Sequence, residues 1–455
     1  MQMPALKMTA QTNNRLREIG AFAFPVFLEQ FSIAFMSVMS TVFVASAGTA
    51  AVSGVSLIES MNYLIQQPFL GLEIGAVVVI AQYCGRGDFE SASKASIQAM
   101  ITSFGVAMVL CVVLFTFPDL AVSPLLGKAD KEVYEAGRLY FRFTVLSFPL
   151  LAIYSIAAAS LRGSGSPRLS LIGVVITNAS FILIGFILVK GFDKGITGVG
   201  TALISARLLG ASVGIFLLVK GKSNIIIRKW IPEKINWNIQ KMILTLGIPA
   251  MIENMVFQGG RLITQTYTVA LGTSAMATNA LSNSIAGFYN IPGNTASVTA
   301  VPIIGKYLGM RNKNEAKASS KMILILSILS LTLLSVILIV LAGPVAGLFT
   351  SDKYIADSVI YVTRWNLIVS PFIWTTSFVT PAILRASGDI RFTTIVSVSS
   401  MLLFRVTLGY LFAFVLGWGV IGIWAGMFAD WTVRSILFGG RYLKGRWTER
   451  VVIKD

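Results

Sequence analysis

Long apolar runs separated by short polar connectors dominate the pattern of this chain. Residues 97–117 and 169–189 contain no charged side chain, and residues 322–351 contain none over a stretch longer than one membrane crossing. A run of about 18 or more apolar residues is typical of a transmembrane helix. Because lipid offers no hydrogen-bond partner to an open backbone, we expect these runs to be helices and the protein to be an all-α polytopic membrane protein.

The apolar pattern recurs along the whole chain and predicts twelve transmembrane helices in two groups of six. The longest polar connector, residues 220–242, is basic and divides the chain into halves. The expected helices lie near residues 18–46, 51–83, 95–117, 136–161, 168–189, 197–219, 243–271, 275–307, 321–350, 358–384, 392–415 and 418–439.

Composition and charge agree with a membrane protein. Hydrophobic residues make up 55% of the chain and charged residues only 13%, whereas soluble domains carry about 25% charged residues. A net charge of +17 would suggest nucleic acid in a soluble protein, but here Lys and Arg collect in alternate connectors, as cytoplasmic loops do. We expect no nucleic-acid partner, and a monomer that crosses the inner (plasma) membrane several times with both termini in the cytoplasm.

The reactive side chains are few, and this limits the possible chemistry. The chain has no histidine, and its two cysteines, Cys84 and Cys111, lie in or beside apolar segments without metal-ligand spacing. A nucleotide-binding loop of the form G-x-x-x-x-G-K-[ST] is also absent from the sequence. We therefore expect no enzymatic activity, no cofactor and no bound metal, except for a possible Na⁺ at Glu253. Energy would come from H⁺ or Na⁺, with carboxylates as the proton carriers.

The two halves of the chain are related by an internal repeat. An offset of 224 pairs residues 25–96 with residues 249–320 without a gap, and 15 of the 72 pairs are identical. The coincident positions include prolines, glycines and one glutamate, which apolar composition alone does not align. The identical pairs include Pro25/Pro249, Glu29/Glu253, Gly48/Gly272, Pro68/Pro292 and Tyr83/Tyr307.

This repeat predicts the division of the chain into lobes. We expect an N-terminal lobe at residues 1–219, a cytoplasmic linker at 220–242, a C-terminal lobe at 243–440 and a basic cytoplasmic tail at 441–455. Parallel repeats related by an axis along the membrane normal are a transporter architecture. A substrate path would then run between the lobes, with alternating access to the two sides of the membrane.

Three ordered sets of motifs carry a family resemblance. "AQYCGRGDFESASKAS" (81–96) and "GKYLGMRNKNEAKASS" (305–320) follow the second and eighth expected helices, and "LRGSGSPR" (161–168) and "LRASGDIR" (384–391) follow the fourth and tenth. Together with residues 404–447, this set resembles the multidrug and toxic compound extrusion (MATE) family over nearly the whole chain. The resemblance implies export of organic compounds, which we expect to be cationic, in exchange for H⁺ or Na⁺.

The chain also departs from the family pattern. Many members carry an acid in the middle of the first helix, but around Ser40 this chain has none. One branch carries an Asp in the tenth helix, whereas residues 365–384 contain no charge. The ion-binding residues of the family therefore do not transfer directly to this sequence.

Two glutamates that each follow a proline by four residues are the first candidates for ion coupling. A charged group at bilayer depth costs roughly 2.5–3.5 kcal/mol on insertion scales, so it is rarely kept without a role. Glu253 follows Pro249, which we expect to kink its helix, and Glu29 follows Pro25 in the same way. The alternative for each is a structural ion pair with a neighbouring arginine. We favour Glu253 as the main coupling group.

Further polar residues are candidates for the substrate cavity. Glu59 and Glu73 are 14 residues apart in the second expected helix, which places them on one helical face, where Arg142 or Arg261 are alternative structural partners. Arg261 lies eight residues after Glu253, as a counter-ion or as a contact for an anionic substrate. Neutral hydrogen bonds would come from Asn283 and Asn290 of the eighth helix.

Other interpretations remain open from the sequence. We interpret Arg405, Asp430 and Arg434 as stabilising the C-terminal lobe, with an ion pair between the last two at i, i+4 spacing. A flippase for lipid-linked saccharides, from the same broad superfamily, is the alternative function, and it would require a more cationic cavity. A channel or a transport-inactive receptor is a third possibility.

Overall fold

The protein is helical throughout the part of the chain that the structure describes. The computed structural model describes residues 3–46, 48–127, 129–221, 223–225, 227, 235–349 and 352–453, and among these it contains helices and no β-strand. Much of the expected 220–242 linker lies outside the described residues. The expected all-α fold is therefore confirmed.

Ten helical segments in the described part of the chain are long and apolar enough to cross a membrane. An eleventh would be the pair Lys131–Leu146 and Phe148–Gly163, which is bent by 49°. The remaining expected span, at 275–307, consists of two helices, α11 (Thr273–Tyr289) and α12 (Ile291–Gly309), which meet at Asn290. The helices thus agree with a polytopic protein, although the spans expected at 51–83, 136–161 and 275–307 each consist of two helices.

The described residues form two compact units, which we call the N-unit (residues 28–251) and the C-unit (residues 3–27 and 252–453). Two long helices, α1 (Met3–Ala45) and α10 (Trp237–Ala270), contribute to both units. The first part of α1 belongs to the C-unit, and the first part of α10 belongs to the N-unit. Each unit therefore contains the beginning of a helix whose remainder lies in the other.

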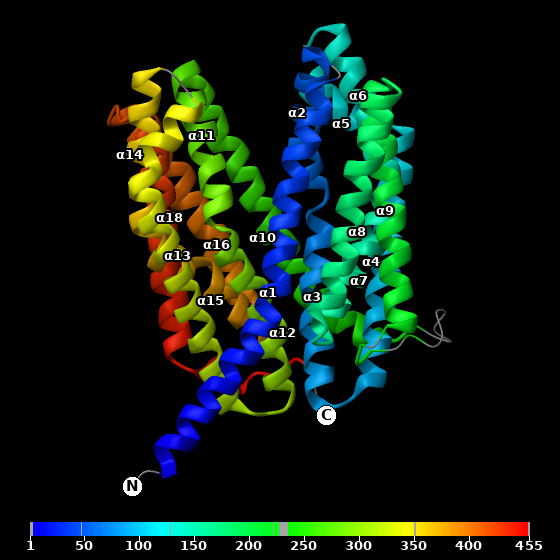
Figure 1. Ribbon diagram of the computed structural model, residues 1–455, viewed down its shortest axis with the longest axis vertical. Helices are drawn as coiled ribbons and strands as arrows, with labels where there is room; N and C mark the ends of the chain where they lie inside the picture. Colours follow the sequence, from blue (N-terminus) through cyan, green and yellow to red (C-terminus); the bar gives the residue numbers. More distant parts are fainter. Residues whose placement is uncertain are drawn as a thin grey trace. The chain divides into compact units, whose positions relative to one another are not determined.

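The N-unit is built from short and long helices around one apolar core. Phe43, Phe69, Phe148 and Phe181 are fully buried there and form two tilted ring pairs. Besides parts of α1 and α10, its helices are α2 (Thr49–Ile65), α3 (Gln67–Arg86), α4 (Phe89–Thr116), α5 (Asp119–Leu126), α6 (Lys131–Leu146), α7 (Phe148–Gly163), α8 (Pro167–Gly185), the π-helix η1 (Phe186–Gly191) and α9 (Gly195–Lys220) (Figure 1).

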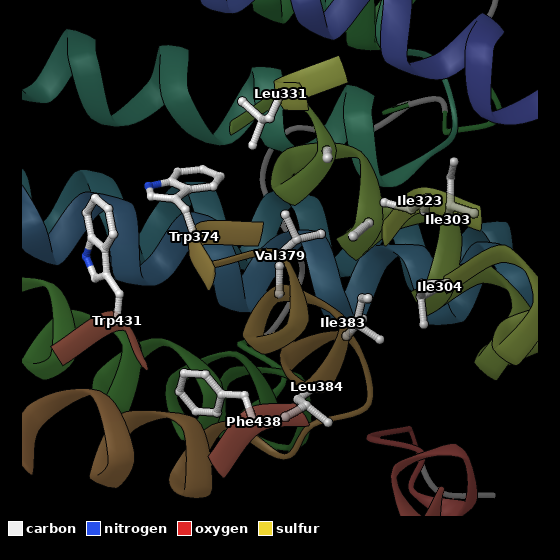
Figure 2. Packing of buried hydrophobic residues seen from close by; sticks show 14 of the residues in the cluster. Ile303, Ile304, Ile323, Leu331, Trp374, Val379, Ile383, Leu384, Trp431 and Phe438 are labelled. Carbon is white, nitrogen blue, oxygen red and sulfur yellow. The ribbon is translucent and has the colours of Figure 1, made fainter. Parts of the chain in front are cut away.

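The C-unit has a larger aromatic core. Figure 2 shows Trp374, Trp431 and Phe438 among the aliphatic side chains of this core, where all three are buried. After α11 and α12, its helices are α13 (Lys313–Phe349), α14 (Lys353–Val369), η2 (Ser370–Trp374), α15 (Thr375–Ala386), α16 (Ile390–Ser400), η3 (Met401–Val406), α17 (Thr407–Tyr410), η4 (Leu411–Val415), α18 (Gly419–Leu443) and the 3₁₀-helix η5 (Arg446–Glu449).

Two glycines allow the beginning of α10 to pack closely on α3 within the N-unit. A Cβ atom at Gly71 would lie 2.6 Å from the carbonyl oxygen of Gly247, and one at Gly75 would lie 2.5 Å from that of Ile243. Gly71 and Gly75 are four residues apart and thus on one face of α3. This small-xxx-small spacing lets two membrane helices approach backbone to backbone.

The internal repeat is visible in the positions where helices begin and break. Gly48 and Gly272, 224 residues apart, precede α2 and α11 with φ values of +104° and +94°. Gln66 and Asn290 likewise mark the breaks after α2 and α11, each followed by a proline at the second position of the next helix. The same local chemistry thus produces the same chain geometry in both halves.

Candidate functional site

Two carboxylates share one guanidinium inside the N-unit. Arg162, in the last turn of α7, donates through Nη1 to Glu29 of α1 and through Nη2 to Glu73 of α3. Ser170 of α8 donates to Glu29 Oε2 at 3.1 Å. Glu29 is 2% exposed and Arg162 is 7% exposed. We call these four residues the N-cluster.

A similar group lies inside the C-unit, and we call it the C-cluster. Arg385, in the last turn of α15, donates through Nη2 to Glu253 of α10 at 2.6 Å. Thr394 of α16 donates to Glu253 Oε2 at 3.4 Å. Glu253 is 5% exposed. The sequence candidate Glu253 is therefore held in a one-to-one buried ion pair, which was the structural alternative.

The two clusters follow the internal repeat. Glu29 and Glu253 are 224 residues apart, and each pairs with the arginine of an "LR-x-SG" motif. In each motif the glycine, Gly165 or Gly388, has a positive φ of +82° or +84°, a conformation that glycine adopts without strain. This turn connects the arginine-bearing helix to the helix that supplies the hydroxyl group.

The clusters differ in their number of carboxylates. Residue 297, which is 224 positions after Glu73, is a serine. The C-cluster therefore has one carboxylate for one guanidinium, whereas the N-cluster has two. Since one guanidinium balances only one negative charge, the N-cluster carries an excess carboxylate that a proton or another cation can neutralise.

Glu59 does not join the N-cluster. A one-residue break at Gln66 separates Glu59 on α2 from Glu73 on α3, so the shared helical face stays a prediction. Glu59 accepts a hydrogen bond from the hydroxyl group of Tyr140 on α6. The two acids thus have different hydrogen-bond partners, Tyr140 and Arg162.

A separate polar cavity of about 90 Å³ lies within the C-unit. Arg261 and Gln265 of α10, Asn279 and Asn283 of α11, and Arg405 of η3 line it, together with Trp424 of α18. Other lining residues are Thr264, Thr268, Ile423 and Met427. Two of the sequence candidates, Arg261 and Asn283, are therefore cavity residues.

Arg405 has a different position from the one we expected. Rather than only stabilising the lobe, it lines this cavity, with its guanidinium 5.4 Å from the ring centre of Phe257. The neighbouring Arg434 lies 4.6 Å from the ring centre of Phe378, and Asp430 accepts a hydrogen bond from Ser400 at 2.6 Å. In the described chain, Asp430 and Arg434 form no direct ion pair: Asp430 is bonded to Ser400, and Arg434 donates to a backbone carbonyl and packs on aromatic rings.

The remaining sequence candidates have structural positions. Pro25 and Pro249 lie inside α1 and α10, and the expected kinks at these residues stay predictions. Asn290 forms the junction between α11 and α12, and its buried Oδ1 has no hydrogen-bond partner among the described residues. It is therefore a helix-junction residue rather than a lining residue of the cavity described above.

Sequence reasoning did not identify Arg162 and Arg385 as the partners of the glutamates. The sequence suggested only an unspecified neighbouring arginine for Glu29 and Glu253, and it suggested Arg142 or Arg261 for Glu59 and Glu73. The available signal was the repeat itself, because an arginine recurs in both "LR-x-SG" motifs just as a glutamate recurs after both prolines.

Comparison with known proteins agrees with this architecture. The chain is 24% identical over 444 residues to the "Probable multidrug resistance protein NorM" of Thermotoga maritima, covering 96% of this chain and 94% of that protein. It is 24% identical over 328 residues to the "Multidrug export protein MepA" of Staphylococcus aureus, covering 71% of each.

Solved structures show the same fold. The structure titled "Outward-facing conformation of a multidrug resistance MATE family transporter of the MOP superfamily" matches with a TM-score of 0.87 and 18% identity, over 96% of this chain and 97% of that one. A Pyrococcus furiosus MOP-superfamily transporter, whose title reports "reverse polarity of binding pocket", matches with a TM-score of 0.85 and 18% identity over the same shares.

The family model described as MatE matches the chain twice, at residues 25–189 and 249–411. The two matches begin 224 residues apart, which is the offset of the internal repeat. Together with the recurring glutamate–arginine pairs, these matches show that the chain belongs to the MatE family of membrane transporters.

Proposed function

We propose that the protein is a cation-coupled antiporter that exports organic compounds and that the N-cluster is its coupling site. The observation that carries this proposal is the pairing of Glu29 and Glu73 with the single guanidinium of Arg162. The names of the multidrug exporters among its relatives support drug export over the flippase alternative.

The charge balance of the N-cluster supports proton coupling. With both carboxylates ionised, the cluster carries one net negative charge in a buried site, which is costly. Protonation of one carboxylate removes that charge. A Na⁺ ion in the same place would meet the nearby guanidinium, which repels it strongly at low dielectric constant. We therefore propose H⁺ rather than Na⁺ as the coupling ion.

The C-cluster has a different proposed role. The Glu253–Arg385 pair is already neutral, so it offers no excess charge for a coupling ion to balance. We propose that this pair fixes α10 to α15 and α16. The coupling role that the sequence favoured for Glu253 is thereby assigned to its repeat partner Glu29, together with Glu73.

The energy available is sufficient for concentrative export. One elementary charge moving through 100 mV releases about 2.3 kcal/mol, and one pH unit adds about 1.4 kcal/mol. One proton exchanged for one neutral compound therefore sustains a gradient of a few hundredfold, since each tenfold ratio requires about 1.4 kcal/mol. Alternating access of the two lobes would convert this gradient into export.

The test uses proteoliposomes in which a pH gradient and a Na⁺ gradient are imposed separately. Transport of ethidium and of fluorescein, one cationic and one anionic probe, is followed together with internal pH. We expect the pH gradient alone to drive transport in the wild type. Glu73→Gln should abolish this response, because the remaining Glu29–Arg162 pair is neutral and has no excess charge to exchange.

A matched control separates coupling from a general loss of charge. Glu90→Gln removes a carboxylate of α4 whose side chain is 80% exposed, and it should leave proton-driven transport unchanged. Glu253→Gln should reduce stability but retain the response to the pH gradient. Transport by Glu73→Gln that still follows the pH gradient, at equal protein abundance, would refute the N-cluster as the coupling site.

A further inference from the structure

The cavity inside the C-unit is cationic. Arg261 and Arg405 line it, and no carboxylate belongs to its lining in the described chain. The charged groups that act on Arg405 are Asp430, Arg261 and Arg434. Counted with Arg405, these are three positive charges and one negative charge. The surroundings of the cavity therefore leave a positive excess.

Arg434 is packed among aromatic rings. Its guanidinium lies within 4.6 to 5.7 Å of three ring centres, those of Phe257, Phe378 and Phe438, and its Nη2 donates to a backbone carbonyl at 3.3 Å. Arg434 is not part of the cavity lining. The positive charge that faces the cavity thus comes from Arg261 and Arg405.

The neutral groups of the cavity are arranged as hydrogen-bond donors. Asn279 Oδ1 accepts from Trp424 Nε1 at 3.1 Å and from Asn283 Nδ2 at 3.0 Å. An amide oxygen that accepts two hydrogen bonds leaves its NH₂ group as the polar end that can meet a further partner. An amide donor next to two guanidinium groups suits a negatively charged acceptor.

Local helix geometry positions Arg405 at this cavity. The helix that begins with α16 widens into the π-helix η3 (Met401–Val406), which contains Arg405. π-helical turns are rare and occur frequently at functional sites. Arginines inside membrane-spanning segments are costly and are usually kept for a function. A widened turn that carries Arg405 and a second lining arginine, Arg261, on a different helix both point to a bound ligand.

We propose that this cavity binds the acidic group of an aromatic organic anion, so that the compounds exported by this protein include carboxylates or sulfonates. A volume of about 90 Å³ holds such a group but not a drug-sized molecule, whose remainder would extend beyond the cavity. The indole of Trp424 and the side chain of Met427 supply apolar contact for an attached ring. This inference rests on the proposed export function and replaces the cationic substrates expected from the family resemblance.

Binding of salicylate to the full chain in lipid nanodiscs tests the proposal without any ion gradient. Salicylate carries a ring and one carboxylate, and salicylamide is its neutral analogue with nearly the same shape. We expect saturable binding of salicylate at pH 7.5 in titration calorimetry, and at least tenfold weaker binding of salicylamide. Equal affinity of the two compounds, or no saturable salicylate binding, would overturn the proposal.

Variants assign the binding to this cavity. Arg405→Gln and Arg261→Gln should each weaken salicylate binding about tenfold or more, whereas Arg405→Lys, which keeps the charge, should retain most of it. Arg364→Gln is the matched control, because it removes an exposed arginine of α14 outside the cavity. Binding that is unchanged in the two cavity variants, or lost equally in Arg364→Gln, would refute the assignment.

Two further probes distinguish the possible sources of the anionic group. Chloride, titrated against salicylate, should compete only weakly, and displacement by equimolar chloride would indicate a halide site instead. Farnesyl pyrophosphate tests for a lipid-linked phosphate. If it binds through Arg405 while salicylate does not, the proposal fails in favour of a lipid substrate. Loss of salicylate binding with intact proton-driven ethidium transport would contradict this inference alone and leave the antiport function standing.

Discussion

Removal of Arg162 should destabilise the protein more than removal of its counterpart Arg385. Arg162→Gln leaves the carboxylates of Glu29 and Glu73 without their cation, whereas Arg385→Gln leaves only Glu253. Breaking a buried ion pair by removing one partner costs about 3–5 kcal/mol. The side chain of Glu73 is 20% exposed, so leaving it without its cation should cost less stability than leaving Glu29 without its cation. We expect a loss of about 4–6 kcal/mol for Arg162→Gln and about 3 kcal/mol for Arg385→Gln.

Removal of the two stranded carboxylates should reverse this loss. The additional changes Glu29→Gln and Glu73→Gln in the same variant should restore most of the loss, because they remove the stranded charges.

Thermal unfolding of the purified protein, followed by tryptophan fluorescence, measures these effects. The wild type, the two single variants and the triple variant are compared in one detergent. The reasoning fails if Arg162→Gln is no less stable than Arg385→Gln. It also fails if the triple variant is as unstable as Arg162→Gln alone, since charge would then not be the cause.

Four more predictions follow from the geometry. Gly75→Leu should lower the free energy of unfolding by about 1–3 kcal/mol, because its Cβ would lie 2.5 Å from a backbone oxygen of α10. Gly105→Leu, which has open space around it, should change little in the same unfolding assay. Gly165→Ala should cost about 1–2 kcal/mol, because the φ of +82° strains other residues, and an unchanged melting temperature would contradict this. Arg15→Met should lower the free energy of unfolding by less than about 1 kcal/mol, although Arg15 and Glu315 form a bidentate pair, because both side chains are partly exposed. A larger decrease, measured by chemical unfolding, would show that the pair is desolvated. Finally, the exchange of one inward proton for one outward monovalent organic anion moves two charges across the membrane. A membrane potential of 100 mV should therefore add about 4.6 kcal/mol to the driving force for export. Electrode recordings on proteoliposomes should detect this charge movement, and they should show none if the exported compound is a monovalent cation.

Much of the fold was accessible from the sequence because the constraints are strong and local. Lipid forces apolar segments into helices, so the run lengths alone predicted an all-α membrane protein. The repeat was accessible because Gly48 and Gly272 need a positive φ, and a substitution there is strained. These residues therefore keep their place in both halves although most of the apolar residues around them have changed.

The contacts of the candidate site were less accessible, because they depend on which helix faces meet. Glu29 and Arg162 are 133 residues apart, and Glu253 and Arg385 are 132 residues apart. Apolar periodicity is weak in helices that are apolar on every side, so it does not reveal these pairings. The π-helical turn that carries Arg405 also has no sequence signature, and its position in the cavity became clear only from the structure.

The exchange of helix beginnings between the two units has a consequence for synthesis of the chain. All residues of the N-unit have been synthesised once residue 251 is added, so this unit can assemble before the C-unit. The C-unit contains residues 3–27, which precede the N-unit, and residues 252–453, which follow it. The first segment must therefore wait unpartnered through more than two hundred residues of elongation. A gene split in the connector at 220–242 would yield two polypeptides, neither of which holds a complete unit, and only their co-expression would supply every segment of both.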